Sequence, residues 1–350
     1  MPRQLRHDVE GGWYHITTRG MFRKEIFEND RDREHFMELL ALMVERHCVV
    51  LHAYVLMDNH YHLLIETPEA NASRALQWLN LSYAAWFNAK HQRSGPVFQA
   101  RFKSIPVDGE GSWALTCSIY IHLNPVRIRS LGQGKDDRAR EKAGFMQEGP
   151  TAEQVKARLA VLRKHPWSSY HAYAGYAPKP DSLTCERLWW HAGQKKDADP
   201  KADYRRYIED YVRQGVEEGV FERITAALAI GGTSFIENLR RKVPRKAGSE
   251  TNARAWRRLL TFEAVVQAVE QVKEESWQDF ADRRGDWGRD LVLYVARSRS
   301  GRTLDELGTL SGMSKHGVSK AVQRMHVRLS EDKKLNRIHR KVMLALEEKG

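Results

Sequence analysis

The order of apolar patterns along residues 13–107 constrains the fold of this chain more than any other feature. Four segments are rich in β-branched and aromatic residues, which favours strands. Two longer segments repeat apolar residues every three or four positions, which favours helices. The expected strands cover residues 13–18, 48–57, 60–66 and 102–107, and the expected helices cover residues 30–46 and 71–90. The predicted order is therefore strand, helix, strand, strand, helix, strand.

This order is that of a split β-α-β unit, the ferredoxin-like arrangement of an antiparallel sheet with helices. The turn at Asp58-Asn59 is short enough to join the second and third strands as a hairpin. A further helix is expected from residue 112 to about residue 123, where Asn124-Pro125 stops it. We therefore predict an α+β domain over residues 1–180.

The remainder of the chain is predicted to be all-α. A helical connector is expected over residues 181–255, and a helical domain over residues 256–350. Residues 238–258 hold eight basic residues and a single acid, Glu250. This segment is either a solvated linker or a strip that contacts phosphates, and the sequence favours neither interpretation.

A helix-turn-helix is predicted within the last domain, over residues 304–325. A first helix is followed by a turn that contains Gly312, and Val318, Val322 and Met325 are expected to face inward on the second helix. Such a motif presents its second helix to DNA, where basic and polar side chains contact phosphates and base edges. The outward-facing candidates are Lys315, His316, Ser319, Lys320, Gln323 and Arg324. The alternative is a structural helical hairpin, which is common in proteins that bind no DNA.

The charge balance also favours a nucleic acid. The chain has 57 Lys and Arg against 45 Asp and Glu, a formal net charge of +12. Such an excess favours a polyanionic partner, with nucleic acid as the first candidate and an acidic membrane surface as the second. An ordinary basic protein has the same excess, so charge alone does not decide between these partners.

The cysteine and hydropathy patterns argue against several classes of protein. Cys48, Cys117 and Cys185 lie far apart and form no CxxC pair, which argues against a disulfide framework or a zinc cluster. No run of about eighteen apolar residues is present, and no apolar segment follows the basic N-terminus. We therefore expect a cytoplasmic protein without a membrane span.

His60 and His62 form the sharpest chemical signal in the sequence. Side chains alternate between the two faces of a strand, so these two imidazoles point the same way while Tyr61 points into the core. Two imidazoles at this spacing can chelate one divalent cation. Glu66 falls on the same face, two steps further along the strand. The alternative is a pair of hydrogen-bonded histidines with no metal.

Tyr120 and Asn124 form a second candidate pair, because residues four apart share one face of a helix. An amide oxygen is a hard, neutral ligand that suits Mg²⁺ or Mn²⁺ better than Zn²⁺. Asn124 can then complete a site with the two histidines and place the Tyr120 phenol beside the cation. The alternative is that Asn124-Pro125 only stops the helix. His122 lies about 200° from Tyr120 around the helix and is not expected to be a ligand.

The chain resembles the IS200-like transposases, and within them the REP-associated tyrosine transposases, which belong to the wider group of HUH nucleases. The segments that carry the resemblance are residues 14–20, 56–65, 98–104, 120–127 and 167–170. Asp58 stands where the family usually has proline before the Asn-His pair, a turn position without chemistry. The helix-turn-helix is similar to the DNA-binding domain of the replication initiator DnaA.

The resemblance implies an enzyme that cleaves single-stranded DNA near hairpin-forming repeats and transfers the strand through a 5′-phosphotyrosine. Carried over by position, the nucleophile is Tyr120 and the ligands of Mg²⁺ or Mn²⁺ are His60, His62 and Asn124. It further implies the ferredoxin-like sheet of HUH nucleases and a bacterial, nucleoid-associated protein. Whether the protein is a monomer or a homodimer stays open.

Basic residues near the segments that carry the resemblance are candidate DNA contacts, and the alternative for each is an ordinary surface charge. They are Arg101, Lys103, Arg127 and Arg129. Two other functions remain open. A domesticated, non-catalytic DNA-binding regulator would keep the fold without needing Tyr120, whereas an RNA-binding ferredoxin-like protein would need an aromatic platform that the sequence does not suggest.

Overall fold

The protein forms two compact units, Arg6–Gly231 and Gly232–Gly350, which are described separately. The computed structural model describes residues 8–110, 112–128, 131, 150–193, 199–214, 229–241, 261–283, 285–300, 302 and 304–348. Most of the basic segment, residues 242–258, and the candidate Arg129 lie outside these residues. Within them, no helix is long and apolar enough to cross a membrane.

The N-terminal unit is built on a four-stranded antiparallel sheet with the strand order β2-β3-β1-β4. The strands are β1 (Gly12–Arg19), β2 (Val50–Met57), β3 (His60–Thr67) and β4 (Lys103–Val107). Each lies within two residues of its expected bounds. This strand order is that of the ferredoxin-like fold, so the predicted α+β class is confirmed.

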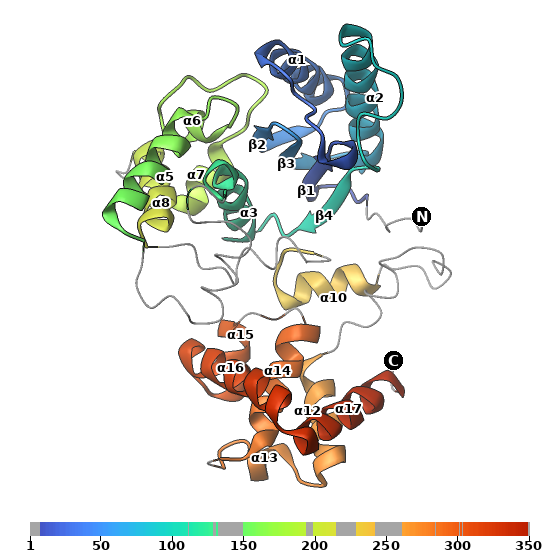
Figure 1. Ribbon diagram of the computed structural model, residues 1–350, viewed down its shortest axis with the longest axis vertical. Helices are drawn as coiled ribbons and strands as arrows, with labels where there is room; N and C mark the ends of the chain where they lie inside the picture. The colour runs from blue at the N-terminus through green and yellow to red at the C-terminus, as the bar shows by residue number, and fades with distance from the viewer. Residues whose placement is uncertain are drawn as a thin grey trace. The chain divides into compact units, whose positions relative to one another are not determined.

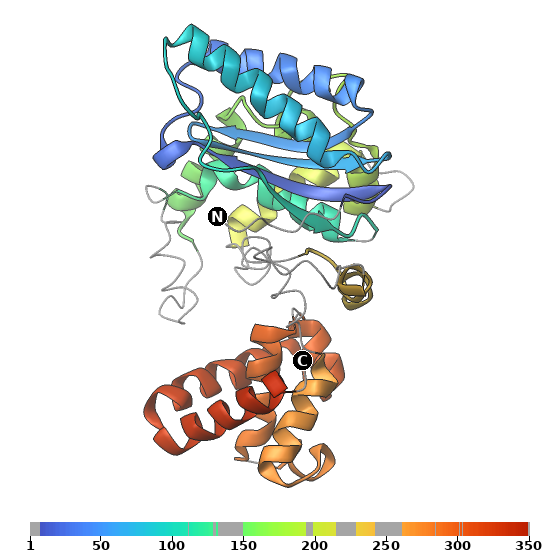
Figure 2. The ribbon, with the colours of Figure 1, turned by 90° about the vertical axis from the view of Figure 1, so that its right-hand side faces the viewer.

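Helices cover both faces of this sheet (Figures 1 and 2). The first face carries α1 (Asp30–Arg46) and α2 (Ala72–Lys90). The second face carries α3 (Ser112–His122), continued by the 3-10 turn η2 (Asn124–Val126). Beside α3 lie α5 (Ala152–Lys164), α6 (Tyr170–Tyr173), α7 (Glu186–Ala192) and α8 (Pro200–Gln214).

The alternation of side chains along β3 decides which residues meet which layer. Tyr61, Leu63 and Ile65 are fully buried on the face that α1 and α2 cover. The Tyr61 hydroxyl donates to Oδ1 of Asn80 on α2, at 2.6 Å. His60 and His62 therefore belong to the opposite face, which α3 covers.

The helices α7 and α8, which fall within the expected connector, pack on the N-terminal unit. Tyr204 of α8 is fully buried, and its hydroxyl lies 2.9 Å from Oγ of Ser118 on α3. Both edge strands are also partly covered, because Val55 of β2 bridges to Ser168 and Val107 of β4 bridges to Ile230. Such cover protects the sheet from pairing with other chains.

The C-terminal unit is helical. Its helices are α10 (Thr233–Arg241), α12 (Phe262–Lys273), α13 (Trp277–Phe280), α14 (Trp287–Arg299), α15 (Leu304–Ser311), α16 (Lys315–Glu331) and α17 (Lys333–Glu348). Helix α16 buries Val318 and Met325 against its neighbours, as its apolar spacing predicts, and it also buries Ala321. Val322, which was also expected to face inward, is only partly buried.

The turn between α15 and α16 depends on two glycines. Gly312 has a φ of +69°, a left-handed conformation that side chains with a Cβ rarely adopt. A Cβ at Gly308 would lie 2.6 Å from the carbonyl oxygen of Met313. The two glycines allow the second helix to start directly after the first and to pack closely on it.

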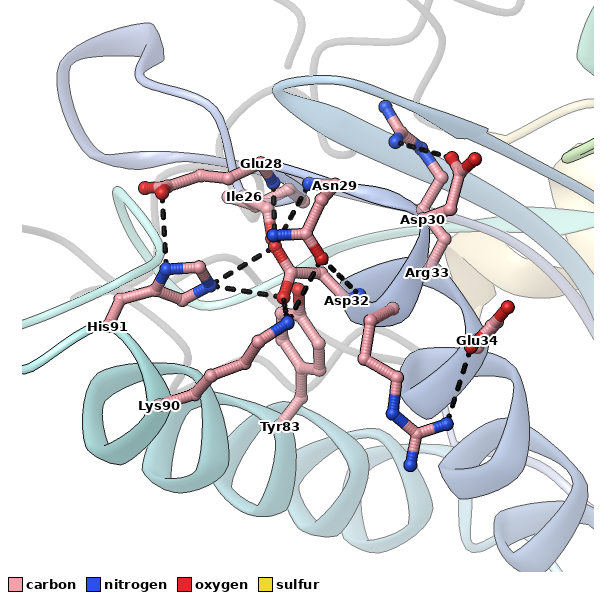
Figure 3. A network of polar contacts seen from close by, with 11 residues as sticks. Ile26, Glu28, Asn29, Asp30, Asp32, Arg33, Glu34, Tyr83, Lys90 and His91 are labelled. Carbon is pink, nitrogen blue, oxygen red and sulfur yellow. Dashed lines mark hydrogen bonds and ion pairs between the residues drawn. The ribbon is translucent and has the colours of Figure 1, made fainter.

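A buried carboxylate ties the start of α1 to the end of α2 (Figure 3). Asp32 is fully buried and accepts from the backbone of Glu28 at 2.7 Å, from Nζ of Lys90 at 2.6 Å and from Nε2 of His91 at 3.0 Å. It also completes a capping box with Asn29. Burial raises the pKa of Asp32, but the hydrogen bonds from Lys90 and His91 outweigh this effect and hold the pKa below its ordinary value.

Removing this charge should destabilise the N-terminal unit. We expect Asp32→Asn to lower the free energy of unfolding by about 2–4 kcal/mol, because Lys90 loses its buried partner. Asp30→Asn is the matched control, since Asp30 is in the same helical turn but its side chain is 76% exposed. It should change stability by less than about 0.5 kcal/mol in urea unfolding. Equal effects of the two variants would contradict this account.

The contribution of Asp32 should also depend on pH with a defined sign. A carboxyl group with a depressed native pKa stabilises the fold above the pKa of the unfolded chain, near 3.9. That stabilisation is lost as the pH falls through the lower native value. The difference in stability between wild type and Asp32→Asn should therefore shrink as the pH falls below about pH 4.

Candidate active site

The antiparallel pairing of β1 with β3 assembles a row of polar side chains on the face that α3 covers. Thr17 of β1 lies opposite His62 of β3, and Lys103 of β4 lies opposite Thr17. His15 lies two residues before Thr17 and so shares its face. The two predicted histidines are thus joined by a third from a neighbouring strand.

Helix α3 brings Tyr120 onto this row. Its ring centroid lies 5.6 Å from that of His62 and 5.5 Å from that of His15, and both contacts are edge-on. The rings of His60 and His62 lie 5.1 Å apart. The paired imidazoles and the phenol, 58 residues apart between His62 and Tyr120 along the chain, therefore meet across the helix–sheet interface.

Asn124 lies one helical turn beyond Tyr120, at the start of η2. Its Nδ2 donates to the carbonyl oxygens of Tyr120, at 2.8 Å, and of Ile121, at 3.4 Å. These bonds fix the amide group and leave Oδ1 as the atom suited to a cation. Asn124-Pro125 also ends the helix, so the structural and the chemical interpretations of this residue are compatible.

Burial keeps the site histidines neutral at ordinary pH. It lowers the pKa of His60 to about 4, with a further contribution from the charge of Arg19. Burial likewise holds the pKa of His62 well below its usual range, assisted by the neighbouring His15 and by Arg127. Neutral imidazoles have a free nitrogen lone pair, which metal ligation requires.

His60, His62 and Asn124 are the residues that would hold the expected divalent cation. Among the described residues, no three His, Cys, Asp or Glu side chains are grouped to hold a metal ion. Glu66 is engaged elsewhere, since it lies 3.1 Å from Nε2 of His52 and 3.4 Å from Arg187. Two imidazoles and an amide oxygen leave positions that phosphate oxygens and water can fill, as is usual for Mg²⁺.

His122 has a structural environment, in agreement with its exclusion as a ligand. It is fully buried, with Nδ1 at 2.8 Å from the Tyr204 hydroxyl and Nε2 at 2.7 Å from Oγ of Ser169. Ser169 in turn accepts from the backbone N–H of Tyr54 on β2, at 2.9 Å. This chain of hydrogen bonds holds α3 against the sheet and α8, and so fixes the position of Tyr120 over the sheet.

The candidate DNA contacts near the site differ in their surroundings. The Arg127 guanidinium lies over the Tyr120 ring, 5.0 Å from its centroid. Lys103 is partly buried on β4 beside the polar row, and burial lowers its pKa. Arg101 is exposed just before β4. Two of the three candidates therefore border Tyr120 or the histidines directly.

The candidates on α16 are mostly exposed. Lys315, Lys320 and Gln323 project from the helix, and Ser319 is partly covered. Arg324 differs, because its guanidinium binds the carboxylate of Asp290 on α14 through contacts of 2.9 and 3.1 Å. Its expected role as a DNA contact therefore competes with a role in holding α16 against α14.

Sequence reasoning missed His15 and Thr17. Both lie in the expected first strand, with the parity that places them on one face. The signal that could have found them is the pairing of that strand with residues 60–66. Pairing register is a property of the sheet, and no local pattern specifies it.

Two comparisons with known proteins find similarity to transposases. Residues 8–124 match the family model described as "Transposase IS200 like", a segment that spans the four strands and ends at Asn124. A solved structure described as a REP-associated tyrosine transposase bound to a REP hairpin is similar at 14% identity, over 53% of this chain and 92% of that chain, with a TM-score of 0.35. No curated relative matches the chain.

The family match covers the sheet, α1 to α3 and all four residues of the predicted site. It supports a transposase role, with DNA as the partner. Residues 8–124 are therefore similar to the IS200-like transposases, and the family model leaves the rest of the chain unmatched.

Proposed function

We propose that this protein is a tyrosine transposase that nicks and rejoins single-stranded DNA, with Tyr120 as the nucleophile. The observation that carries the proposal is the edge-on approach of the Tyr120 ring to His62, at 5.6 Å between centroids, on the face of the sheet that also bears His60. A phenol beside two neutral imidazoles suits metal-assisted phosphoryl transfer, in which a cation activates the nucleophile and polarises the phosphoryl oxygen.

In the proposed reaction the Tyr120 oxygen attacks the scissile phosphorus. The bond from phosphorus to the 3′ oxygen breaks as the bond to the phenolic oxygen forms. The phenol loses its proton and the leaving 3′ oxygen gains one, so a 5′-phosphotyrosine and a free 3′-OH result. Attack by the 3′-OH of another strand reverses the step and transfers the strand without an external energy source.

The residues around Tyr120 would each have a defined part in this step. His60, His62 and Asn124 would hold Mg²⁺ or Mn²⁺, which supplies Lewis-acid polarisation of the phosphoryl oxygen when bound. The Arg127 guanidinium, 5.0 Å from the centre of the Tyr120 ring, favours the ionised phenol and the phosphate. Lys103 and Arg101 would contact the backbone of the strand, and hairpin-forming repeats are the expected substrate.

A non-catalytic DNA-binding regulator is the second candidate. It is consistent with the basic composition and with the exposed cations of α16. It does not require a phenol beside paired histidines. The two functions therefore differ in what wild-type protein does to DNA, and not in whether it binds.

A covalent adduct with DNA tests the proposal. Wild-type protein and a labelled single-stranded repeat hairpin, incubated with Mn²⁺, should give a band on a denaturing protein gel that carries the label. Tyr120→Phe should lower its yield at least about 10³-fold, because the attacking oxygen is removed. His60→Ala should lose the metal-dependent adduct while hairpin binding persists.

Tyr176→Phe is the control for the nucleophile, since Tyr176 belongs to the same unit and is 43% exposed. This variant should form the adduct as wild type does. An adduct that survives Tyr120→Phe would refute the nucleophile assignment. Tight hairpin binding by the wild type without any adduct would favour the regulator.

We further propose that α16 contacts duplex DNA. Lys315, Lys320 and Gln323 are exposed on a helix whose opposite side is buried, which is the form of a groove-reading helix. Arg324 is also exposed, but a phosphate contact by its guanidinium would compete with the ion pair to Asp290.

The salt dependence of binding tests the role of α16. In the full chain, Lys315→Gln with Lys320→Gln should lower the slope of log K against log salt concentration by about 2, since each lost phosphate contact contributes about 0.9. Binding would be measured to a short DNA duplex. Lys156→Gln with Lys164→Gln, two exposed lysines of α5, is the charge-matched control and should leave the slope unchanged. Equal slopes for both double variants would sink this proposal.

A further inference from the structure

His15 and Thr17 form a closed triangle of polar contacts with His62. Nε2 of His15 lies 2.9 Å from Nδ1 of His62, and the Thr17 hydroxyl lies 3.1 Å from the same nitrogen. The Thr17 hydroxyl also lies 3.5 Å from Nε2 of His15. One nitrogen of His62 thus has two polar partners on the neighbouring strand.

The two imidazoles are also held by their packing. The rings of His15 and His62 are stacked, with centroids 5.1 Å apart and planes 9° from parallel. Tyr120 closes the group, with its ring edge-on to both imidazoles. His15 is 2% exposed and His62 is 5% exposed, so both rings are enclosed by protein.

We infer that His15 and Thr17 are positioning residues that present Nε2 of His62 to the catalytic cation. This inference rests on the proposed function and adds to it the residues that orient one ligand. A ligating imidazole binds through one nitrogen and donates the N–H of the other, and that second bond fixes the ring and its tautomer. With Nδ1 of His62 committed to His15 and Thr17, Nε2 is the nitrogen left for a cation.

The arrangement within His15 is unusual for a residue with only a packing role. Its Nδ1 is buried, and in the described part of the chain it has no hydrogen-bond partner. When Nδ1 of His62 donates to Nε2 of His15, the proton of His15 resides on that partnerless Nδ1. A buried N–H without a hydrogen-bond partner is unfavourable, and an apolar side chain at position 15 would avoid it. A histidine that accepts from His62 must carry its proton there.

The test measures two properties of the full chain, which are its affinity for Mn²⁺ alone and the tautomer of His62. His15→Phe keeps an aromatic ring but removes the acceptor, and Thr17→Val removes the hydroxyl while conserving shape. We expect His15→Phe to weaken Mn²⁺ binding about 10- to 100-fold, and Thr17→Val less. Nitrogen NMR of histidine-labelled protein with Mg²⁺ should show His62 protonated at Nδ1 in wild type and shifted toward the Nε2-protonated form in His15→Phe.

Activity gives a separate readout. Adduct formation by His15→Phe should recover at saturating Mn²⁺, whereas Tyr120→Phe should not recover at any concentration. Thr18→Val is the control, because Thr18 points to the opposite face of β1, and it should bind Mn²⁺ as wild type does. If His15→Phe does not fold, His15→Gln and Thr17→Val take its place in the test. His15→Gln retains an acceptor and should bind Mn²⁺ more tightly than His15→Ala.

Two outcomes would overturn the inference in distinguishable ways. If His62→Ala abolishes Mn²⁺ binding but His15→Phe and Thr17→Val bind as wild type with an unchanged His62 tautomer, the positioning role is wrong and the proposed function stands. If His62→Ala binds Mn²⁺ as tightly as wild type does, the assigned cation site itself is wrong, and the inference fails with it.

Discussion

The register between β1 and β3 is the constraint on which the rest of the site depends. It places Thr17 opposite His62, and therefore brings His15 within hydrogen-bond distance of the second metal-ligand candidate. A slip of one residue would turn His15 and Thr17 to the other face, under α1 and α2. The apolar residues of both strands oppose such a slip, because Ile16 and Tyr61 are fully buried in that other layer.

A second group of contacts sets the position of α3, and with it that of Tyr120, over the sheet. His122 and Ser118 on α3 bind Ser169 and Tyr204, which come from segments far along the chain. The helix is therefore held by polar bonds of defined length as well as by apolar packing. Burial makes these bonds costly to break, which suits the role proposed for Tyr120 on this helix.

The electrostatics of the site fit a phosphate better than a bare cation. The imidazoles are neutral, and the charged groups nearest to His62 in effect are Arg19 and Arg127. Such surroundings attract an anion and weaken the binding of a metal ion on its own. A cation that arrives with a phosphodiester would meet both requirements, because the DNA adds negative charge to that of Asp58, the carboxylate that acts on His60.

The sequence by itself determined the elements, their order and the faces of each element, because side-chain alternation and helical spacing are local properties. From these it follows that His60 and His62 share a face, and that Tyr120 and Asn124 share another. Only the tertiary structure decided that His15 meets His62, that Asp290 holds Arg324, and that α7 and α8 pack on the first unit. Each of these depends on pairing register or on helix packing between distant segments, which no local pattern specifies.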